Sequence, residues 1–230
     1  MDPTPERVLL NLREVRDRIA AAAARSGRAA GAVRLVAVTK TVPVEMIGVL
    51  TGAGQRDIGE NRPQQIRDRA AALADPSIAW HLIGQLQRNK VKYVVPLAAM
   101  IHSVDSLALA EEISKRAQAQ GARAACLLEI NSGEESKSGI GPAEALRLAP
   151  AVAALPGIHL AGLMTMAPLA ADPAAVRPVF AALRDLRDRL NREAPLPRPL
   201  TELSMGMTQD YEVAIEEGAT IVRVGTALFR

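Results

Sequence analysis

The chain has 230 residues, a length that suits one large domain, and we expect a single domain over residues 1–230. Hydrophobic residues make up 49% of the sequence and aromatic residues only 2%, which argues against binding single-stranded nucleic acid by base stacking. The formal net charge is +3, and basic residues alternate with acidic ones, as in residues 184–192, so no basic block indicates a nucleic-acid partner.

The remaining compositional signals concern redox state and location. The single cysteine, Cys126, rules out an internal disulfide, and the apolar run ACLLEI around it predicts a packed core thiol. No apolar stretch reaches membrane-spanning length, and no secretory signal opens the chain. We therefore expect a cytoplasmic protein with no membrane partner.

The first predicted element is a helix over residues 4–25, in which Val8, Leu12, Val15 and Ile19 share one face. After it, short apolar runs alternate with helical patterns. Strands are predicted at residues 34–39, 56–59, 79–84, 100–104, 124–131, 158–164, 201–204 and 221–224. Helices are predicted at residues 44–51, 63–74, 90–95, 106–120, 142–153, 172–191 and 209–217.

This alternation predicts the fold class. Strands that alternate with helices form parallel sheets, and eight of them favour closure into a (β/α)8 TIM-type barrel, here with an extra N-terminal helix. An open, doubly wound α/β sheet is the alternative. No G-x-G-x-x-G motif follows the first predicted strand, which makes the open sheet the weaker interpretation.

Lys40 follows the first predicted strand, where the chain turns through Thr41, Val42 and Pro43. A lysine whose stem lies among apolar neighbours loses hydration, which lowers its pKa and leaves a neutral amine able to attack an aldehyde. Arginine cannot take this role because its guanidinium stays protonated. Alternatively, Lys40 simply extends to solvent at the strand end. The sequence leaves these two interpretations open.

Polar residues gather at the carboxyl ends of the predicted strands, which in an eight-stranded barrel meet on one rim and form the active site. Each also permits a structural role: Asn61 or Asp105 as a helix cap, His81 as a hydrogen-bonded core histidine, and Glu60 as a solvated loop charge. Their shared position predicts a ligand site. These residues include Lys40, Glu60, Asn61, His81, Gly84, Gln85, His102, Ser103, Asp105, Asn131, Thr165, Ser204, Gly206, Arg223 and Thr226.

The turns after the last two predicted strands indicate a phosphate site. Residues 204–208 (SMGMT) follow one strand and Gly225–Thr226 the other, the recurrent place for phosphate in such barrels. A serine hydroxyl, glycines and successive N–H groups can together hold a phosphate dianion. Gly206 and Gly225 could also serve only as turn glycines, but we favour the phosphate site.

A phosphate site beside a reactive lysine predicts a phosphorylated aldehyde as ligand, and pyridoxal 5′-phosphate (PLP) meets both requirements. Arg223, in the last predicted strand, could donate a hydrogen bond to the pyridine nitrogen. The nitrogen would then stay unprotonated and the ring would be a weak electron sink. A salt bridge between Arg223 and a helix carboxylate is the alternative.

Several longer motifs, in order along nearly the whole chain, resemble those of the pyridoxal-phosphate homeostasis proteins, single-domain barrels similar to the barrel of bacterial alanine racemase. They are AVTKTVP (37–43), IGEN (58–61), WHLIGQLQRNK (80–90), IHSVDS (101–106), NSGEESKSGI (131–140), GLMTMAP (162–168), LSMGMTQDYEVAI (203–215) and IVRVGTALF (221–229).

The resemblance implies a role for each matching residue. Lys40 would carry PLP as an internal imine, Ser204, Gly225 and Thr226 would contact the phosphate, and Arg223 would face the pyridine nitrogen. Asn61, His81 and Met205 would line the pocket. The family is thought to bind PLP and supply it to PLP-dependent apoenzymes, with no firm catalytic turnover. We accordingly expect a monomeric carrier with no catalytic residues and no metal site.

The chain also departs from the family pattern. Arg62, Leu82 and Gln85 replace residues that are commonly an aromatic, a phenylalanine and a proline. Lys137, in the segment 134–139, could be a second aldehyde site or a charged loop residue. A PLP-dependent racemase that uses Lys40 as its base is the alternative function, and a sugar-phosphate enzyme acting through a lysine imine is a further one.

Overall fold

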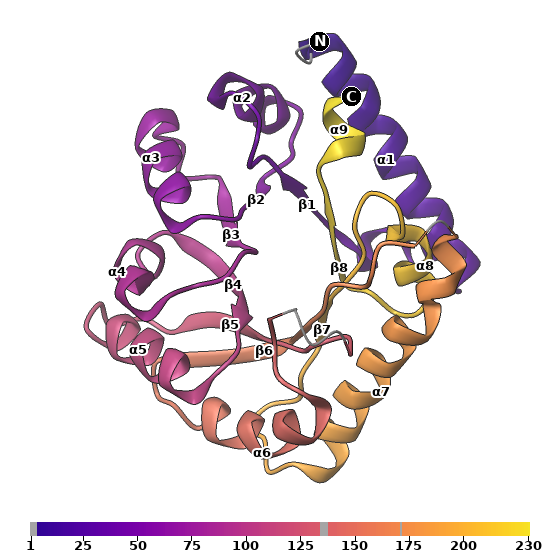
Figure 1. The fold of residues 1–230 in the computed structure, drawn as a ribbon. Helices are drawn as coiled ribbons and strands as arrows, with labels where there is room; N and C mark the ends of the chain where they lie inside the picture. Colours follow the sequence, from indigo (N-terminus) through magenta and orange to yellow (C-terminus); the bar gives the residue numbers. More distant parts are fainter. Residues whose placement is uncertain (1–3, 134–137, 171) are drawn as a thin grey trace.

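The structure is a computed structural model that describes residues 4–133, 138–170 and 172–230. Eight parallel strands, hydrogen-bonded in chain order, close into a barrel surrounded by helices (Figure 1). This confirms the predicted TIM-type barrel. The strands are β1 (Arg34–Val38), β2 (Asp57–Glu60), β3 (Ala79–Leu82), β4 (Ala98–Val104), β5 (Ala124–Glu129), β6 (Ile158–Met164), β7 (Glu202–Ser204) and β8 (Ile221–Val224).

Helices cover the outside of the barrel. The α-helices are α1 (Pro5–Arg25), α2 (Val44–Gly52), α3 (Pro63–Leu73), α4 (Val91–Val94), α5 (Leu107–Gln118), α6 (Pro142–Ala153), α7 (Arg177–Glu193), α8 (Tyr211–Glu216) and α9 (Thr226–Phe229). Short 3₁₀ helices are η1 (Ala30–Ala32), η2 (Arg88–Lys90) and η3 (Pro173–Val176). Within the described ranges, none of these helices combines the length and hydrophobicity needed to span a membrane.

The helices differ from the prediction in several places. The helix expected at residues 90–95 divides into η2 and α4, and the one expected at residues 172–191 begins as η3 before α7. In the second case Pro178 lies in the first turn of α7. Proline has no N–H and is tolerated in the first turn of a helix, so α7 begins just before it. The short helix α9 was not predicted.

Apolar side chains form two separate layers. A small cluster fills the barrel interior: Val36, Met100, Leu127, Ala161, Met164 and Ile221. A much larger cluster packs between the outer faces of the strands and the helices. Cys126 belongs to this outer layer, and burial raises the pKa of its thiol to about 12, which confirms the predicted core thiol.

Helix α1, near the N-terminus, packs against the C-terminal helices of the chain. Its predicted apolar face is buried, and it runs alongside α8 and α9 (Figure 1). The Asn11 side-chain amide donates to the carbonyl oxygens of Leu228 (3.2 Å) and Arg230 (2.7 Å), and Arg25 pairs with Glu216 at 2.9 Å. The Asn11 bonds hold α9, and with it the turn at Gly225, against α1, and the Arg25 pair holds α8 there.

We predict that Gly162→Ala destabilises the barrel, because a Cβ at this β6 position would overlap the carbonyl oxygen of Glu202 on β7. Overpacking of this kind costs about 1–3 kcal/mol, measurable by urea unfolding. Gly48→Ala is the matched control: Gly48 lies inside α2 with nothing near its added Cβ, so it should stabilise by about 0.5–1 kcal/mol. Equal stability of both variants would contradict the prediction.

Candidate functional site

Lys40 lies at the carboxyl rim of the barrel, close to the turn that follows β8. Ala37 of β1 is in register with Val224 of β8, and a Cβ on Gly225 would lie only 3.1 Å from the carbonyl oxygen of Val38. The predicted lysine and the second predicted phosphate turn are therefore neighbours. Lys40 itself is exposed, so of the two interpretations that the sequence left open, extension to solvent at the strand end is the one that fits the structure.

The backbone around Lys40 is held by two side chains of α3. The Arg69 guanidinium donates to the carbonyl oxygens of Thr39 (2.7 Å) and Val42 (2.8 Å), and the Gln65 amide donates to that of Lys40 (3.1 Å). Neither Gln65 nor Arg69 was among the residues predicted from the sequence. The only signal was their spacing, because positions four apart share one face of a helix.

Glu60, at the end of β2, completes this arrangement. Its side chain is fully buried, and Oε1 accepts hydrogen bonds from the Thr39 hydroxyl and the Arg69 guanidinium. Oε2 is buried without a partner among the described residues. Burial raises the pKa of the Glu60 carboxyl, against the effect of the Thr39 hydrogen bond and the Arg69 charge. Interpreting Glu60 as a solvated loop charge is therefore wrong.

Arg223 places a cation inside the barrel. It is only 4% exposed and donates to Ser204 Oγ (2.7 Å) and to the carbonyl oxygen of Thr165 (2.9 Å). Burial lowers its pKa to about 10, against the charges of Asp210 and Glu129, so the guanidinium stays charged at neutral pH. The alternative of an ion pair with a helix carboxylate is not found among the described residues. A guanidinium has five N–H donors, so donors remain for a ligand.

The Ser204 hydroxyl is directed into the barrel. Its Oγ lies 2.9 Å from His102 Nδ1 as well as 2.7 Å from Arg223, so its contacts do not fit a hydroxyl that binds phosphate. His81 has both ring nitrogens in use, with His102 Nε2 at 2.9 Å and Asp57 Oδ1 at 3.0 Å. It is the hydrogen-bonded core histidine that the sequence analysis gave as its structural alternative.

Asn61 and Met205 differ in their access to the site. Asn61 is half-buried at the rim, and a Cβ on Gly84 would overlap its carbonyl oxygen, so the loops after β2 and β3 touch backbone to backbone. The Met205 side chain is fully buried in the outer apolar layer, while its N–H donates to the carbonyl oxygen of Ile221 (3.1 Å). Asn61 can therefore face a ligand at the rim, whereas the Met205 side chain cannot.

The turn after β7 requires glycine at position 206. Its φ is +92°, and a Cβ there would lie 2.6 Å from Ala214 Cβ. The Gly206 carbonyl oxygen accepts from Arg223 N (3.0 Å), and Thr208 Oγ1 accepts from Ala227 N (3.4 Å). The turns after β7 and β8 are thus joined to each other, on the rim that also carries Lys40.

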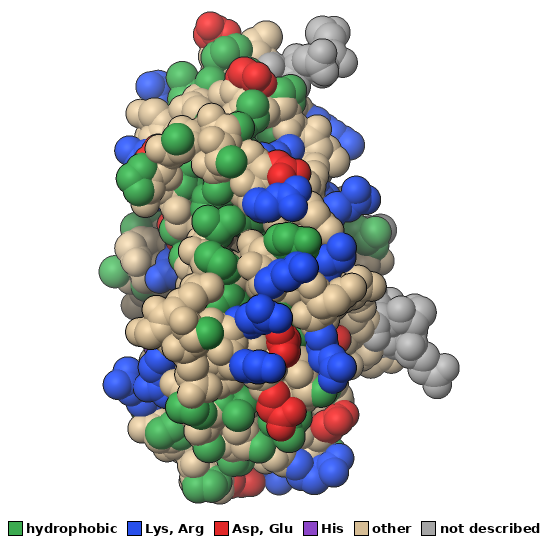
Figure 2. All heavy atoms as spheres, turned by 90° about the vertical axis from the view of Figure 1, so that its left-hand side faces the viewer, with side chains coloured by type: hydrophobic (Ala, Val, Ile, Leu, Met, Phe, Trp, Pro, Cys, Tyr) green, Lys and Arg blue, Asp and Glu red, His purple; other side chains and the backbone are tan. Residues whose placement is uncertain are grey.

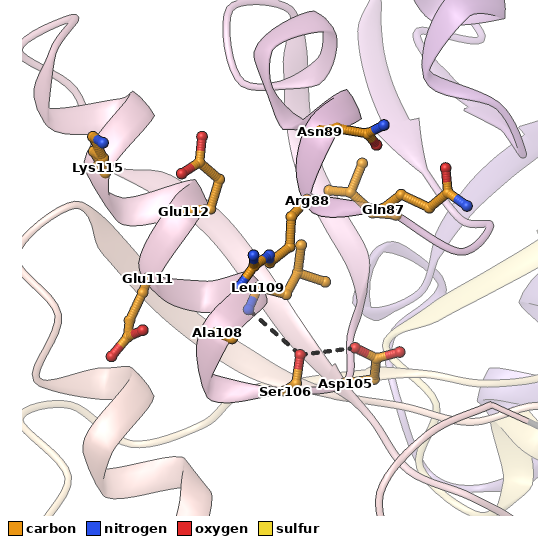
Figure 3. Close-up of a pocket in the computed structure, with 11 residues that line it drawn as sticks. Gln87, Arg88, Asn89, Asp105, Ser106, Ala108, Leu109, Glu111, Glu112 and Lys115 are labelled. Carbon is orange, nitrogen blue, oxygen red and sulfur yellow. Dashed lines mark hydrogen bonds between the residues drawn. The ribbon is translucent and has the colours of Figure 1, made fainter.

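A separate groove of about 820 Å³ opens between η2 and α5 (Figure 3). Figure 3 shows Arg88 extending across it toward α5, where Glu111, Glu112 and Lys115 stand. Ser106 caps α5, so the alternative of Asp105 as its helix cap is wrong. None of the residues predicted to bind a cofactor lines this groove.

The outer face formed by α3 and α4 carries a cluster of cations around one aromatic ring. Arg67, Lys90 and Lys92 lie 5.2, 5.9 and 5.0 Å from the ring centre of Tyr93. On the side of the molecule in Figure 2, basic side chains are mixed with acidic and apolar ones. Lys137, the candidate second aldehyde site, lies outside the described residues.

Comparison with known proteins first defines the class. The sequence model of the alanine racemase N-terminal domain matches residues 10–230. An alanine racemase structure from Clostridium difficile shares the fold, with a TM-score of 0.73 at 15% identity, covering 97% of this chain and 55% of that one. The chain thus has the barrel of the alanine racemase type.

More similar proteins define the family. The pyridoxal phosphate homeostasis protein of Aquifex aeolicus is 45% identical over 219 residues, 95% of both chains, and the human one is 38% identical over 231 residues, 95% of this chain and 84% of that one. The structure of PipY from Synechococcus elongatus with PLP bound is 37% identical, with a TM-score of 0.86, covering 97% of this chain and all of that one. The chain belongs to the pyridoxal phosphate homeostasis protein family.

We predict that Arg69→Met destabilises the protein more at pH 7 than at pH 4. At pH 7 the variant leaves the Glu60 carboxylate buried without its cation, a change that costs about 3–5 kcal/mol. Because burial raises the Glu60 pKa in the folded state, stability falls as pH rises above the ordinary carboxyl value of about 4.3, and removal of Arg69 steepens that fall.

Urea unfolding at the two pH values measures this difference. The double variant Glu60→Gln/Arg69→Met is the control, because a neutral amide removes the titrating group, and its stability should depend less on pH. An equal loss for Arg69→Met at both pH values would show that charge is not the cause.

Proposed function

We propose that this protein binds PLP at the carboxyl rim of the barrel and acts in PLP homeostasis as a carrier. The observation that carries the proposal is the placement of the Lys40 turn against Gly225, with Arg223 two residues earlier on β8, inside the barrel. In PLP the aldehyde and the phosphate-bearing arm stand on adjacent ring carbons, and the ring nitrogen lies opposite the aldehyde. In the protein, the Lys40 turn and the Gly225 turn are likewise neighbours, and Arg223 lies apart from both, inside the barrel.

Each group has one task in this arrangement. Lys40 supplies the amine for a Schiff base with the cofactor aldehyde. The backbone of the turns at Gly206 and at Gly225–Thr226 holds the phosphate, and Asn61 stands at the rim beside the ring. Arg223 donates a hydrogen bond to the ring nitrogen. PLP in the structure of the related PipY supports the choice of cofactor.

The chemistry of these residues favours a carrier over an enzyme. A charged guanidinium keeps the ring nitrogen unprotonated, whereas most carbanion chemistry requires an acidic partner that keeps this nitrogen protonated. Neither of the two tyrosines is placed to act as a second acid–base group: Tyr93 lies on the outer face, and Tyr211 is buried in the outer apolar layer. PLP-dependent apoenzymes would be the recipients of the cofactor.

We predict that PLP added to the protein is fixed covalently by borohydride on Lys40. Mass spectrometry of digested protein should find the modified peptide in the wild type and lose it in Lys40→Ala, with PLP affinity at least about tenfold weaker, or roughly 1.4 kcal/mol. Lys92→Ala, a change at another exposed lysine, is the matched control and should retain the modification. Undiminished labelling of Lys40→Ala would refute Lys40 as the anchor.

We also predict no sustained catalysis on amino acids. Protein loaded with PLP and incubated with an amino acid in deuterated water should release little product with exchanged α-hydrogen. Proton NMR of the amino acid measures the exchange, and Lys40→Ala gives the background. Many turnovers per protein molecule, lost in Lys40→Ala, would establish a racemase-like enzyme instead.

A further inference from the structure

Five side chains from five strands form an unbroken line of hydrogen bonds through the barrel. It starts at Asp57 on β2, near the amino end of the barrel, and ends at Arg223 on β8. The successive distances are 3.0 Å from Asp57 Oδ1 to His81 Nε2, 2.9 Å from His81 Nδ1 to His102 Nε2, 2.9 Å from His102 Nδ1 to Ser204 Oγ, and 2.7 Å from Ser204 Oγ to Arg223 Nη1.

Burial makes each of these bonds costly to break. His81, His102, Ser204 and Arg223 are all buried, and only the Asp57 side chain, 29% exposed, reaches solvent. A buried polar group that loses its partner is destabilising, so a fully satisfied line is strongly preferred. The hydrogen atoms in the line are therefore not free to take any arrangement.

The two ends determine the direction of every bond. Arg223 can only donate, so Ser204 Oγ accepts from it and its own hydroxyl is free to donate to His102 Nδ1. His102 Nδ1, the other partner of the Ser204 hydroxyl, therefore accepts, so His102 Nε2 carries the hydrogen and donates to His81 Nδ1. His81 Nε2 in turn donates to the Asp57 carboxylate, which can only accept. One arrangement satisfies all five groups.

The electrostatic surroundings keep this arrangement. Burial lowers the pKa of His102 well below its ordinary value, and the charges of Arg223 and Arg34 lower it further. The charged groups that face this line are Arg34 and Asp57 at the amino end and, around Arg223, Asp210 and Glu129. No carboxylate among the described residues bonds to His102, so its ring stays neutral and its Nδ1 stays an acceptor.

We propose that His102, supported by His81, is a positioning residue: by accepting the Ser204 hydroxyl hydrogen, it turns a lone pair of Ser204 toward Arg223 and so sets the direction of the guanidinium donors. The group that these donors would bind is an unprotonated nitrogen of a heteroaromatic ligand. Its identification as the ring nitrogen of PLP rests on the proposed function, whereas the ordered histidine pair does not depend on any ligand.

The first test uses the wild-type protein without PLP. Long-range ¹⁵N–¹H NMR of imidazoles distinguishes the two neutral tautomers, and the chain contains only three histidines, of which the exposed His159 serves as the reference signal. We expect both His81 and His102 to carry hydrogen on Nε2 and none on Nδ1. A hydrogen on Nδ1 of either ring would overturn the proposal.

The second test separates the two bonds of His102. A Gln side chain places its amide near Nε2 and an Asn side chain near Nδ1, so His102→Gln can keep the contact with His81, and His102→Asn the contact with Ser204. With PLP bound, we expect His102→Gln to shift the cofactor absorption band and weaken binding about tenfold, because the acceptor for Ser204 is lost. His102→Asn should be closer to wild type.

His159→Gln is the control for both variants and should leave band and affinity unchanged. A spectrum and an affinity of His102→Gln equal to those of His159→Gln would overturn the positioning role. Should His102 variants fail to fold, the tautomers measured in the wild type decide the question. Absence of a PLP band in the wild type would refute the proposed function instead, while the NMR test of the histidine pair would still stand.

Discussion

The charged guanidinium of Arg223 inside the barrel is the constraint on which the rest of the site depends. An unpaired charge in a protein interior costs several kcal/mol, and here no carboxylate bonds to it among the described residues. Neutral groups solvate it instead: the Thr165 carbonyl and the Ser204 hydroxyl, the latter oriented by two histidines. A cation whose hydrogen bonds go only to neutral groups keeps its remaining donors available to a ligand and can fix the protonation state of a nitrogen that it contacts.

On the β1–β2 side of the rim, by contrast, the buried charge has a partner of opposite sign. Glu60 is a buried anion that does have its cation, Arg69, and the same guanidinium ties down the carbonyl oxygens on either side of Lys40. The backbone at the predicted anchor is therefore held by hydrogen bonds on both sides, whereas the lysine side chain is exposed. A fixed backbone with a solvent-accessible amine suits a residue that captures an aldehyde from solution and later gives it up.

The proposed carrier role uses both sides of the rim for binding. In that role Lys40 and the turns at Gly206 and Gly225 hold the cofactor, and Arg223 keeps its ring nitrogen unprotonated, which withholds the electron sink that most carbanion chemistry needs. The barrel alone does not decide between a carrier and an enzyme, because one fold can host several functions.

The sequence by itself determined the barrel, its eight strands and the set of rim residues, because strand and helix periodicities are local and strand ends in a closed parallel barrel meet at one rim. It could not determine which way Ser204 points, that His81 contacts a histidine 21 residues away, or that Arg69 clamps the Lys40 turn. Those contacts join residues from different elements, and only closure of the barrel brings them together. Burial of Glu60 and exposure of Lys40 were decided in the same way, since neighbouring elements and not neighbouring residues cover a side chain.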